Sequence, residues 1–170
     1  MILNDEQYKK VWNRVYSELK FYPKCADRNS KTIIPPFVIN KAFVVYGIEN
    51  TNYNETEKMD LLISKALIKC TKPSERIYAL DWQHASFLYD PRKADEQQSI
   101  FVSDKRYLGG GYNAYFPNYY PNGDYHFFIS EDFRFGYLSH PWRKEVCVFG
   151  DELIEEFEEF YKSIGWIKLK

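Results

Sequence analysis

The sequence predicts an α+β fold in one domain, and three observations support this prediction. Three segments carry apolar residues at the spacing of amphipathic helices. The sequence between the second and the third segment is rich in aromatic and β-branched residues, which is typical of strands. The links between these strands are short, which favours antiparallel pairing because a parallel pair needs a long crossover. We therefore expect an antiparallel sheet of about five to seven strands, with three helices packed mainly on one of its faces.

The amphipathic spacing places the expected helices at residues 4–22, 54–72 and 151–164. Asn4 can cap the first helix with its side chain, and Pro23 ends that helix because proline cannot continue it. Cys70 completes the apolar stripe of the second helix, so we expect it to be a buried core thiol. Gly165 supplies a C-terminal stop for the third helix.

The strand-rich region spans residues 77–149, and a further strand is expected within Phe37–Ile48. The expected strands of the region are Ile77–Trp82, Ala85–Tyr89, Ala114–Tyr120, Tyr125–Ser130, Arg134–Ser139 and Glu145–Phe149. Asn122-Gly123 predicts a tight hairpin between the third and fourth of these, since both positions tolerate positive φ. Residues 24–32 and 91–111 are expected to be irregular, and Gly109-Gly110-Gly111 predicts a flexible hairpin or hinge.

The composition is that of an ordinary globular domain, apart from its aromatic content. Of the 170 residues, 45% are hydrophobic and 28% are charged, and a chain of this length can bury a full core. Aromatic residues make up 19%, with 15 Tyr, so many tyrosines should lie half-exposed with their hydroxyl groups hydrogen-bonded. The net charge is −1 and no basic stripe is present, which disfavours general nucleic-acid binding.

The cysteines and the N-terminus indicate a cytoplasmic protein. Cys25, Cys70 and Cys147 are odd in number and form no CxxC pair, so neither a disulfide framework nor a metal knuckle is expected. The N-terminal residues lack the features of a secretion signal. No apolar run approaches the roughly 20 residues that span a membrane, so no membrane association is expected.

Two short runs concentrate the chemically versatile residues. Tyr78–His84 and Phe135–Trp142 each place a Trp within two residues of a His, at the end of an expected strand. The candidate pocket residues are Asp81, Trp82, His84, Asp132, His140 and Trp142. Aromatic walls with a few polar groups suit a ring-bearing small molecule such as a nucleotide. Each of these side chains can equally be an ordinary packed or hydrogen-bonded residue.

The geometry of this pocket depends on features that the sequence leaves open. Strand alternation would point Asp81 away from Trp82 and His84, which argues against a local catalytic triad unless a bulge intervenes. Whether His84 and His140 converge depends on the strand order. Two histidines with Asp124 or Asp132 could hold a divalent metal, but no HxH or HxxxH spacing demands it. No metal and no cofactor is therefore predicted.

Two further groups of residues are candidates for partner binding. The first consists of aromatic residues after the glycine run: Tyr112, Tyr115, Phe116, Tyr119 and Tyr120. They can pack across strands, or they can form a recognition surface of the kind that tyrosine favours. The second is the acidic face of the third helix: Glu155, Glu156, Glu158 and Glu159. It is either a solvated face or a patch that steers a basic partner.

Four motifs carry a resemblance to a known family. They are YALDWQH at 78–84, PNGDY at 121–125, DFRFGYLSHPW at 132–142 and CVFG at 147–150. With them the chain resembles a bacterial family catalogued as domain of unknown function number 2716, from about Trp12 to about Ile154. The resemblance implies a bacterial cytosolic protein and supplies no catalytic residues.

Two functions follow as hypotheses. The first is a non-enzymatic binding protein of the bacterial cytosol, of a toxin-neutralising kind such as an immunity or antidote protein. Its acidic helix would meet a basic protein partner, and the tyrosine-rich segment would supply anchors. The alternative is a small-molecule or nucleotide-binding, or hydrolytic, domain with a Trp/His pocket. An enzymatic role is less expected than a non-enzymatic one, because no complete catalytic set such as a GxSxG elbow is visible in the sequence.

Overall fold

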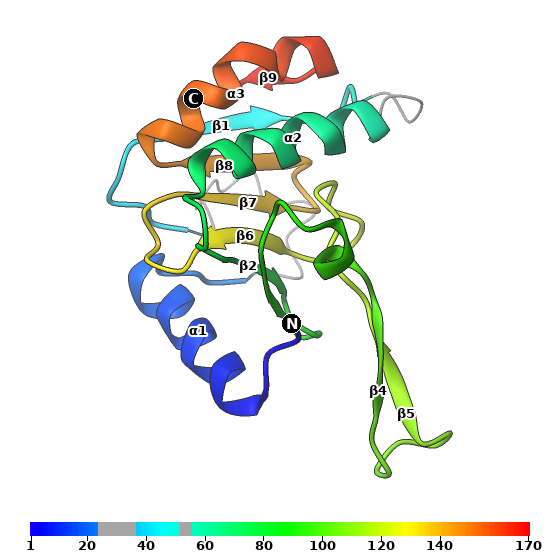
Figure 1. Cartoon of the computed structure of the whole chain (residues 1–170). Helices are drawn as coiled ribbons and strands as arrows, with labels where there is room; N and C mark the ends of the chain where they lie inside the picture. Colours follow the sequence, from blue (N-terminus) through cyan, green and yellow to red (C-terminus); the bar gives the residue numbers. More distant parts are fainter. Residues whose placement is uncertain (24–36, 52–55) are drawn as a thin grey trace.

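The structure, a computed structural model, describes residues 1–23, 37–51 and 56–170 and confirms the α+β fold (Figure 1). In chain order the elements, in which η marks a 3₁₀ helix, are α1 (Asp5–Glu18), β1 (Phe43–Gly47), α2 (Thr56–Cys70), β2 (Ile77–Asp81), β3 (Phe87–Tyr89), η2 (Ala94–Gln97), β4 (Ile100–Ser103), β5 (Gly111–Ala114), β6 (His126–Ser130), β7 (Gly136–His140), β8 (Glu145–Phe149), α3 (Asp151–Phe160), η3 (Tyr161–Ile164) and β9 (Ile167–Lys168). The expected irregular segment 24–32, Cys25 and the expected helix start at Asn54 lie outside the described residues.

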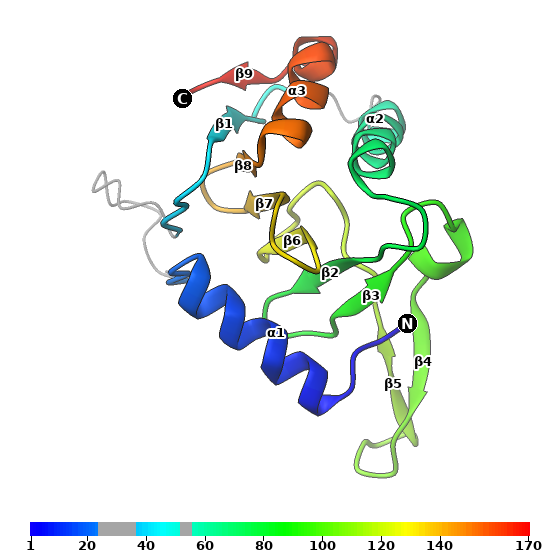
Figure 2. The same cartoon turned by 60° about the vertical axis from the view of Figure 1, so that its left-hand side comes forward.

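A seven-stranded sheet in the order β3-β2-β6-β7-β8-β1-β9 forms the centre of the molecule. All of its pairings are antiparallel. The register places Asp81 opposite His126 on β2 and β6, and Phe127 opposite Leu138 on β6 and β7. Strands β4 and β5 form a separate two-stranded sheet, which projects from the body of the molecule (Figures 1 and 2).

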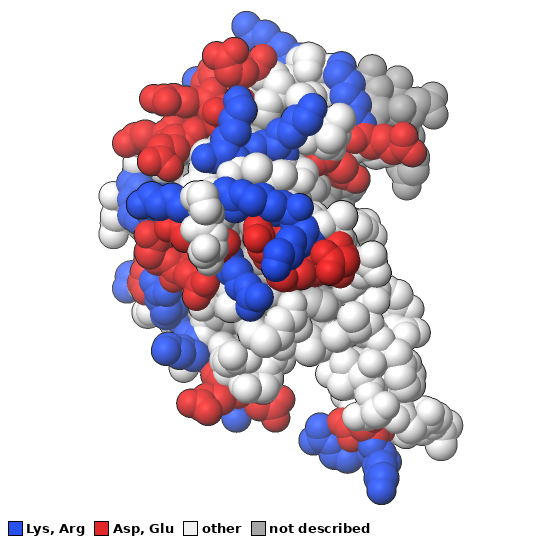
Figure 3. All heavy atoms as spheres, viewed as in Figure 1, with Lys and Arg blue, Asp and Glu red and all other residues white. Residues whose placement is uncertain are grey.

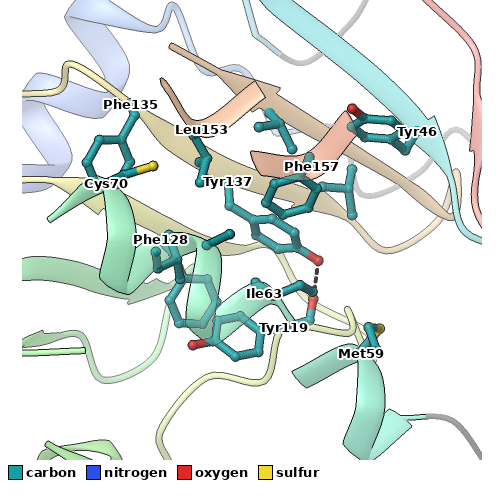
Figure 4. Packing of buried hydrophobic residues seen from close by; sticks show 14 of the residues in the cluster. Tyr46, Met59, Ile63, Cys70, Tyr119, Phe128, Phe135, Tyr137, Leu153 and Phe157 are labelled. Carbon is teal, nitrogen blue, oxygen red and sulfur yellow. Dashed lines mark hydrogen bonds between the residues drawn. The ribbon is translucent and has the colours of Figure 1, made fainter. Parts of the chain in front are cut away.

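Helices cover both faces of the central sheet. Figure 2 shows α2 and α3 on one side of it and α1 on the other. On the α2–α3 side, Tyr137 and Phe157 lie in a large aromatic core, where the Tyr137 hydroxyl donates to the Tyr119 carbonyl oxygen at 2.8 Å (Figure 4). On the α1 side, Trp12 packs on Phe127 with a ring-centroid distance of 5.9 Å. Two of the three helices thus share a face, and α1 closes the other.

Each face of the sheet also buries one thiol. Cys70 belongs to the core under α2 and α3, as the apolar stripe predicts, and Cys147 belongs to the core under α1. Burial raises the pKa of both thiols to about 12. Both cysteines are therefore uncharged core residues in the folded protein.

The N-terminal cap of α1 forms as the sequence predicts. The Asn4 side chain accepts a hydrogen bond from the Gln7 amide at 2.9 Å, and the Gln7 side chain accepts one from the Asn4 amide at 3.0 Å. Trp12, one turn further on, donates from its indole nitrogen to the Ser86 hydroxyl at 3.3 Å and so anchors the helix to the sheet edge. The helix ends at Glu18, one turn earlier than expected.

The expected hairpin around Asn122-Gly123 is wrong. Residues 114–120 do not pair with β6, whose partners are β2 and β7. Pro117 and Pro121 remove backbone donors from this stretch, which explains why it cannot extend a ladder. A hairpin forms instead between β4 and β5, beginning within the segment that was expected to be irregular and turning near the glycine run, for which a flexible hairpin or hinge was expected. Gly109 and Gly110 lie near its tip with φ of 96° and 80°.

Candidate functional site

A turn after β2 brings Asp81 and His84 together. The strand ends at Asp81, and Gln83 adopts a left-handed conformation with φ of 69°. The chain therefore reverses, and the imidazole Nδ1 of His84 lies 3.0 Å from Asp81 Oδ1. The prediction that strand alternation separates these two side chains is wrong, because residues 82–84 form a turn and do not continue the strand.

Asp124 and His126 complete a four-residue cluster around this pair. Asp124 precedes β6, and its Oδ2 lies 3.2 Å from His84 Nδ1. His126 is the register partner of Asp81, and its Nε2 lies 3.7 Å from Asp81 Oδ2. Sequence reasoning missed His126. The spacing of Asp124 and His126 was a usable signal, since residues two apart on a strand share a face.

The two carboxylates surround an imidazole that is itself largely exposed. The hydrogen bond to Asp81 is the main cause that raises the pKa of His84, and the charges of Asp81 and Asp124 add to it against a smaller effect of burial. Burial raises the pKa of Asp124, and the neighbouring Asp81 charge acts in the same direction. The cluster therefore favours a positive charge near its centre.

A cleft with a volume of about 780 Å³ opens beside this cluster. Its floor includes His84 and His126, and chain segments near the N-terminus and around Asn118 contribute to its sides. Aromatic side chains from the projecting hairpin and the segment after it form another wall: Tyr107, Tyr112, Tyr115 and Phe116. The cleft thus combines aromatic walls with a polar, titratable floor, which is the usual make-up of a ligand site.

Three of the other predicted pocket residues lie on the opposite face of the sheet. Trp82, His140 and Trp142 pack around Tyr125, with ring-centroid distances to it of 5.8, 5.0 and 5.1 Å. Tyr125 belongs to the core under α1, whereas His126, the next residue, faces the cleft. His84 and His140 therefore do not converge, and the six predicted residues do not form one pocket.

His140 is nine-tenths buried and lines a smaller, mainly apolar pocket of about 340 Å³. Its Nε2 lies 3.5 Å from the Tyr125 hydroxyl, and its Nδ1 has no hydrogen-bond partner within the described part of the chain. Burial, with a contribution from the Arg143 charge, lowers its pKa to about 4. His140 is therefore a neutral core histidine at neutral pH.

Asp132 lies apart from both groups, in the turn between β6 and β7. Its carboxylate forms an ion pair with Arg134 at 3.3 Å. Arg134 also contacts Glu75 at 2.7 Å and donates to the Cys70 carbonyl oxygen at 2.6 Å. The role of Asp132 in this arrangement is to help hold the turn against the end of α2.

The predicted partner-binding residues divide between surface and core. Tyr115 is exposed, Tyr112 and Phe116 line the cleft, and Tyr119 is buried against Phe128 with a centroid distance of 4.5 Å. The remaining residue of the aromatic group is Tyr120, whose ring lies 5.2 Å from the Lys144 ammonium group.

Two of the four predicted acidic residues of α3 form ion pairs or hydrogen bonds with neighbouring side chains. Glu156 pairs with Lys69 at 2.6 Å, and Glu158 accepts hydrogen bonds from Tyr46 at 2.9 Å and from Lys168 at 2.8 Å. Glu155 and Glu159 are exposed. Acidic side chains gather over α3 in Figure 3, at the end of the molecule away from the projecting hairpin.

These features define a class of protein: an α+β domain with a projecting hairpin beside a cleft that holds histidine and aspartate. The chain belongs to the family described as "Protein of unknown function (DUF2716)", whose model matches residues 2–154, and the expected family resemblance is confirmed. It is 28% identical over 161 residues to "Uncharacterized protein YxiI" of Bacillus subtilis (strain 168), an alignment that covers 92% of this chain and 90% of that protein. No solved structure matches the chain. Among the described helices, none combines the length and apolar character that a membrane crossing requires.

Proposed function

We propose that this chain is a non-enzymatic protein of the bacterial cytosol that binds a protein partner through its arm, defined as residues 100–115. The main observation that supports this proposal is the exposure of large apolar side chains on this segment. They are Ile100, Phe101, Tyr107, Leu108 and Tyr115. In Figure 3 the arm is mainly uncharged, with acidic and basic side chains confined to its tip. Several exposed large apolar side chains gathered on one projecting segment are typical of an interaction site.

The backbone of the arm supports the same proposal. Strands β4 and β5 pair with each other and with no other strand in the described residues. Each therefore presents an outer edge to which a partner strand can add through main-chain hydrogen bonds. Tyr107 packs on Tyr112 across the hairpin with a centroid distance of 4.9 Å, so the aromatic anchors are partly pre-organised for contact.

The shape of the arm suggests what binding does to the partner. A projecting hairpin is convex, so it fits a concave surface, and the concave surface of an enzyme or toxin is commonly its active site. An arm that fills such a site blocks it. This supports the narrower proposal that the protein neutralises its partner, as an immunity or antidote protein does.

In this proposal the acidic face of α3 attracts the partner from a distance and does not contact it closely. Because α3 and the arm lie at opposite ends of the molecule (Figure 1), they do not form one continuous contact surface. Glu155 and Glu159 are exposed and can steer a basic partner over a distance. The close contacts are assigned to the arm.

A second candidate function is supported by the cleft. Its volume of about 780 Å³ falls within the range of small-molecule sites, and its aromatic walls suit a ring-bearing ligand. In this version Tyr112 and Phe116 would stack on the ligand, and His84 would hydrogen-bond to it.

The decisive experiment compares three forms of the protein as bait: the wild type, a Tyr107→Ser, Leu108→Ser double variant, and a Leu61→Ser control. Leu61 is an exposed apolar residue on α2, far from the arm. A partner captured by the wild type and the control should be lost by the double variant, and the affinity of the purified partner should fall by at least about 2 kcal/mol, the loss typical of hot-spot residues. Equal affinity of all three forms would contradict the proposal. Suppression of the partner's own activity by the wild type alone would support the neutralising version.

A further inference from the structure

The cluster in the cleft has the spacing of a metal centre. His84 Nδ1 lies 3.0 Å from Asp81 Oδ1 and 3.2 Å from Asp124 Oδ2, and His126 Nε2 lies 3.7 Å from Asp81 Oδ2. One ligand atom each from Asp81, His84 and Asp124 can be chosen so that all lie within 4.8 Å of one another. A tetrahedral zinc ion with bonds of about 2.0–2.1 Å separates its ligand atoms by roughly 3.3 Å. These three side chains thus need little movement to surround one ion.

His126 provides an independent indication. Its side chain is buried, and its Nδ1 lies 2.9 Å from the Asn118 carbonyl oxygen. A carbonyl oxygen only accepts, so Nδ1 carries the hydrogen and the lone pair of the neutral ring is on Nε2. Nε2 of His126 lies 3.7 Å from Asp81 Oδ2, beyond hydrogen-bond distance. Histidines that bind metals commonly donate their other ring N–H to a backbone carbonyl in this way.

The charge around the cluster also leaves a place for a cation. In the described residues no Lys or Arg forms an ion pair with Asp81 or Asp124; the basic side chains within ion-pair distance of these carboxylates are the imidazoles of His84 and His126. Two carboxylates and two neutral imidazoles carry a charge that one divalent ion balances. Imidazole together with carboxylate suits zinc and similar transition metals, whereas magnesium and calcium prefer oxygen alone.

We infer that Asp81, His84, Asp124 and His126 bind one divalent transition-metal ion of the zinc type at the floor of the cleft. The four proposed ligands belong to β2, the turn after it and the start of β6, not to the arm, so the inference does not depend on the protein-binding proposal.

Calorimetric titration of the metal-stripped full chain with Zn²⁺ tests this inference. The wild type should bind one ion per chain, and His84→Ala and Asp124→Asn should each weaken binding at least tenfold. Asp132→Asn is the matched control, because it also removes an aspartate charge near β6 but lies in the turn at the other end of that strand. No saturable site in the wild type, or equal affinity in all four proteins, would overturn the inference.

His126 is best tested without substitution, because a change at a buried residue can unfold the protein. In the wild type labelled with ¹⁵N-histidine, Zn²⁺ should shift the Nε2 resonance of His126 and leave its Nδ1 bonded to hydrogen. Resonances of His140, on the other face of the sheet, should stay in place. Zinc binding that leaves His126 Nε2 unchanged would remove this residue from the site and overturn the four-ligand assignment.

Discussion

His140 makes the stability of the protein dependent on pH. Burial lowers its folded-state pKa to about 4, whereas a histidine in an unfolded chain titrates near 6.5. Between these values the unfolded state binds a proton that the folded state does not, so the free energy of unfolding falls as the pH falls through this window. The shift corresponds to a loss of about 3 kcal/mol by pH 4.

Urea denaturation at a series of pH values measures this effect. Relative to the wild type, His140→Gln should lose the part of the pH dependence that lies between about 6.5 and 4. His84→Ala is an informative control because His84 has a raised pKa: its contribution is present at low pH and is lost as the pH rises through its folded-state value. An unchanged slope in His140→Gln would show that His140 is not buried as a neutral ring.

Single residues also show where sequence reasoning succeeds and where it stops. The burial of Cys70 could be predicted because the residue completes a helical apolar stripe. The contact between Asp81 and His84 could not, since it depends on a left-handed conformation at Gln83. Glutamine rarely adopts that conformation, and positions 82–85 contain no Gly, Asn or Pro from which the turn could have been predicted.

At the scale of elements, the pairing of β7 with β8 depends on the absence of a side chain at Gly136. Gly136 lies opposite Phe149 in the register, and a Cβ atom placed on it would lie 2.5 Å from a Phe149 ring carbon. Gly136→Ala should therefore displace the buried Phe149 ring and destabilise the protein by about 1–3 kcal/mol.

Gly47→Ala is the matched control for this prediction. Gly47 also lies in a strand, but a Cβ there would meet only the Leu169 side chain at 3.4 Å. This substitution should be neutral or slightly stabilising, because alanine restricts the unfolded chain. Denaturant midpoints measure both changes, and equal midpoints for the two variants would show that the Phe149 ring does not need the space above Gly136.

The elements differ in how well the sequence predicts them. Helices α1 and α3 have long, regular apolar periodicity, and both form close to their expected positions. The strands of the arm are short and flanked by polar residues, so their pattern is no clearer than that of a loop. Residues 114–120 have the aromatic composition of a strand, but tertiary packing and two prolines direct their rings into the core and the cleft.

At the scale of the whole molecule, the strand order decides whether the two Trp/His runs can form one site. Strand β6 lies between β2 and β7, so the two runs are not neighbours in the sheet. Their histidines then fall on opposite faces, one in a cleft and one in a core. Strand order depends on contacts between distant residues, and local patterns contain no information about it. Family motifs identify the chain, but they do not supply this geometry.

Because Cys70 and Cys147 are buried on opposite faces of the sheet, their reactivity toward an alkylating reagent can report which face becomes exposed when the protein partly unfolds. In a Cys25→Ser variant, Cys70 and Cys147 are the cysteines left to react, and burial keeps both as slow-reacting thiols in the native state. Pulsed alkylation followed by peptide mass spectrometry should therefore show little modification without denaturant. In low denaturant, labelling of Cys147 alone would record opening of the layer formed by residues 37–45 and the C-terminal residues, and labelling of Cys70 alone would record detachment of the α2–α3 layer. Simultaneous labelling of both would show that the two layers open as one cooperative unit.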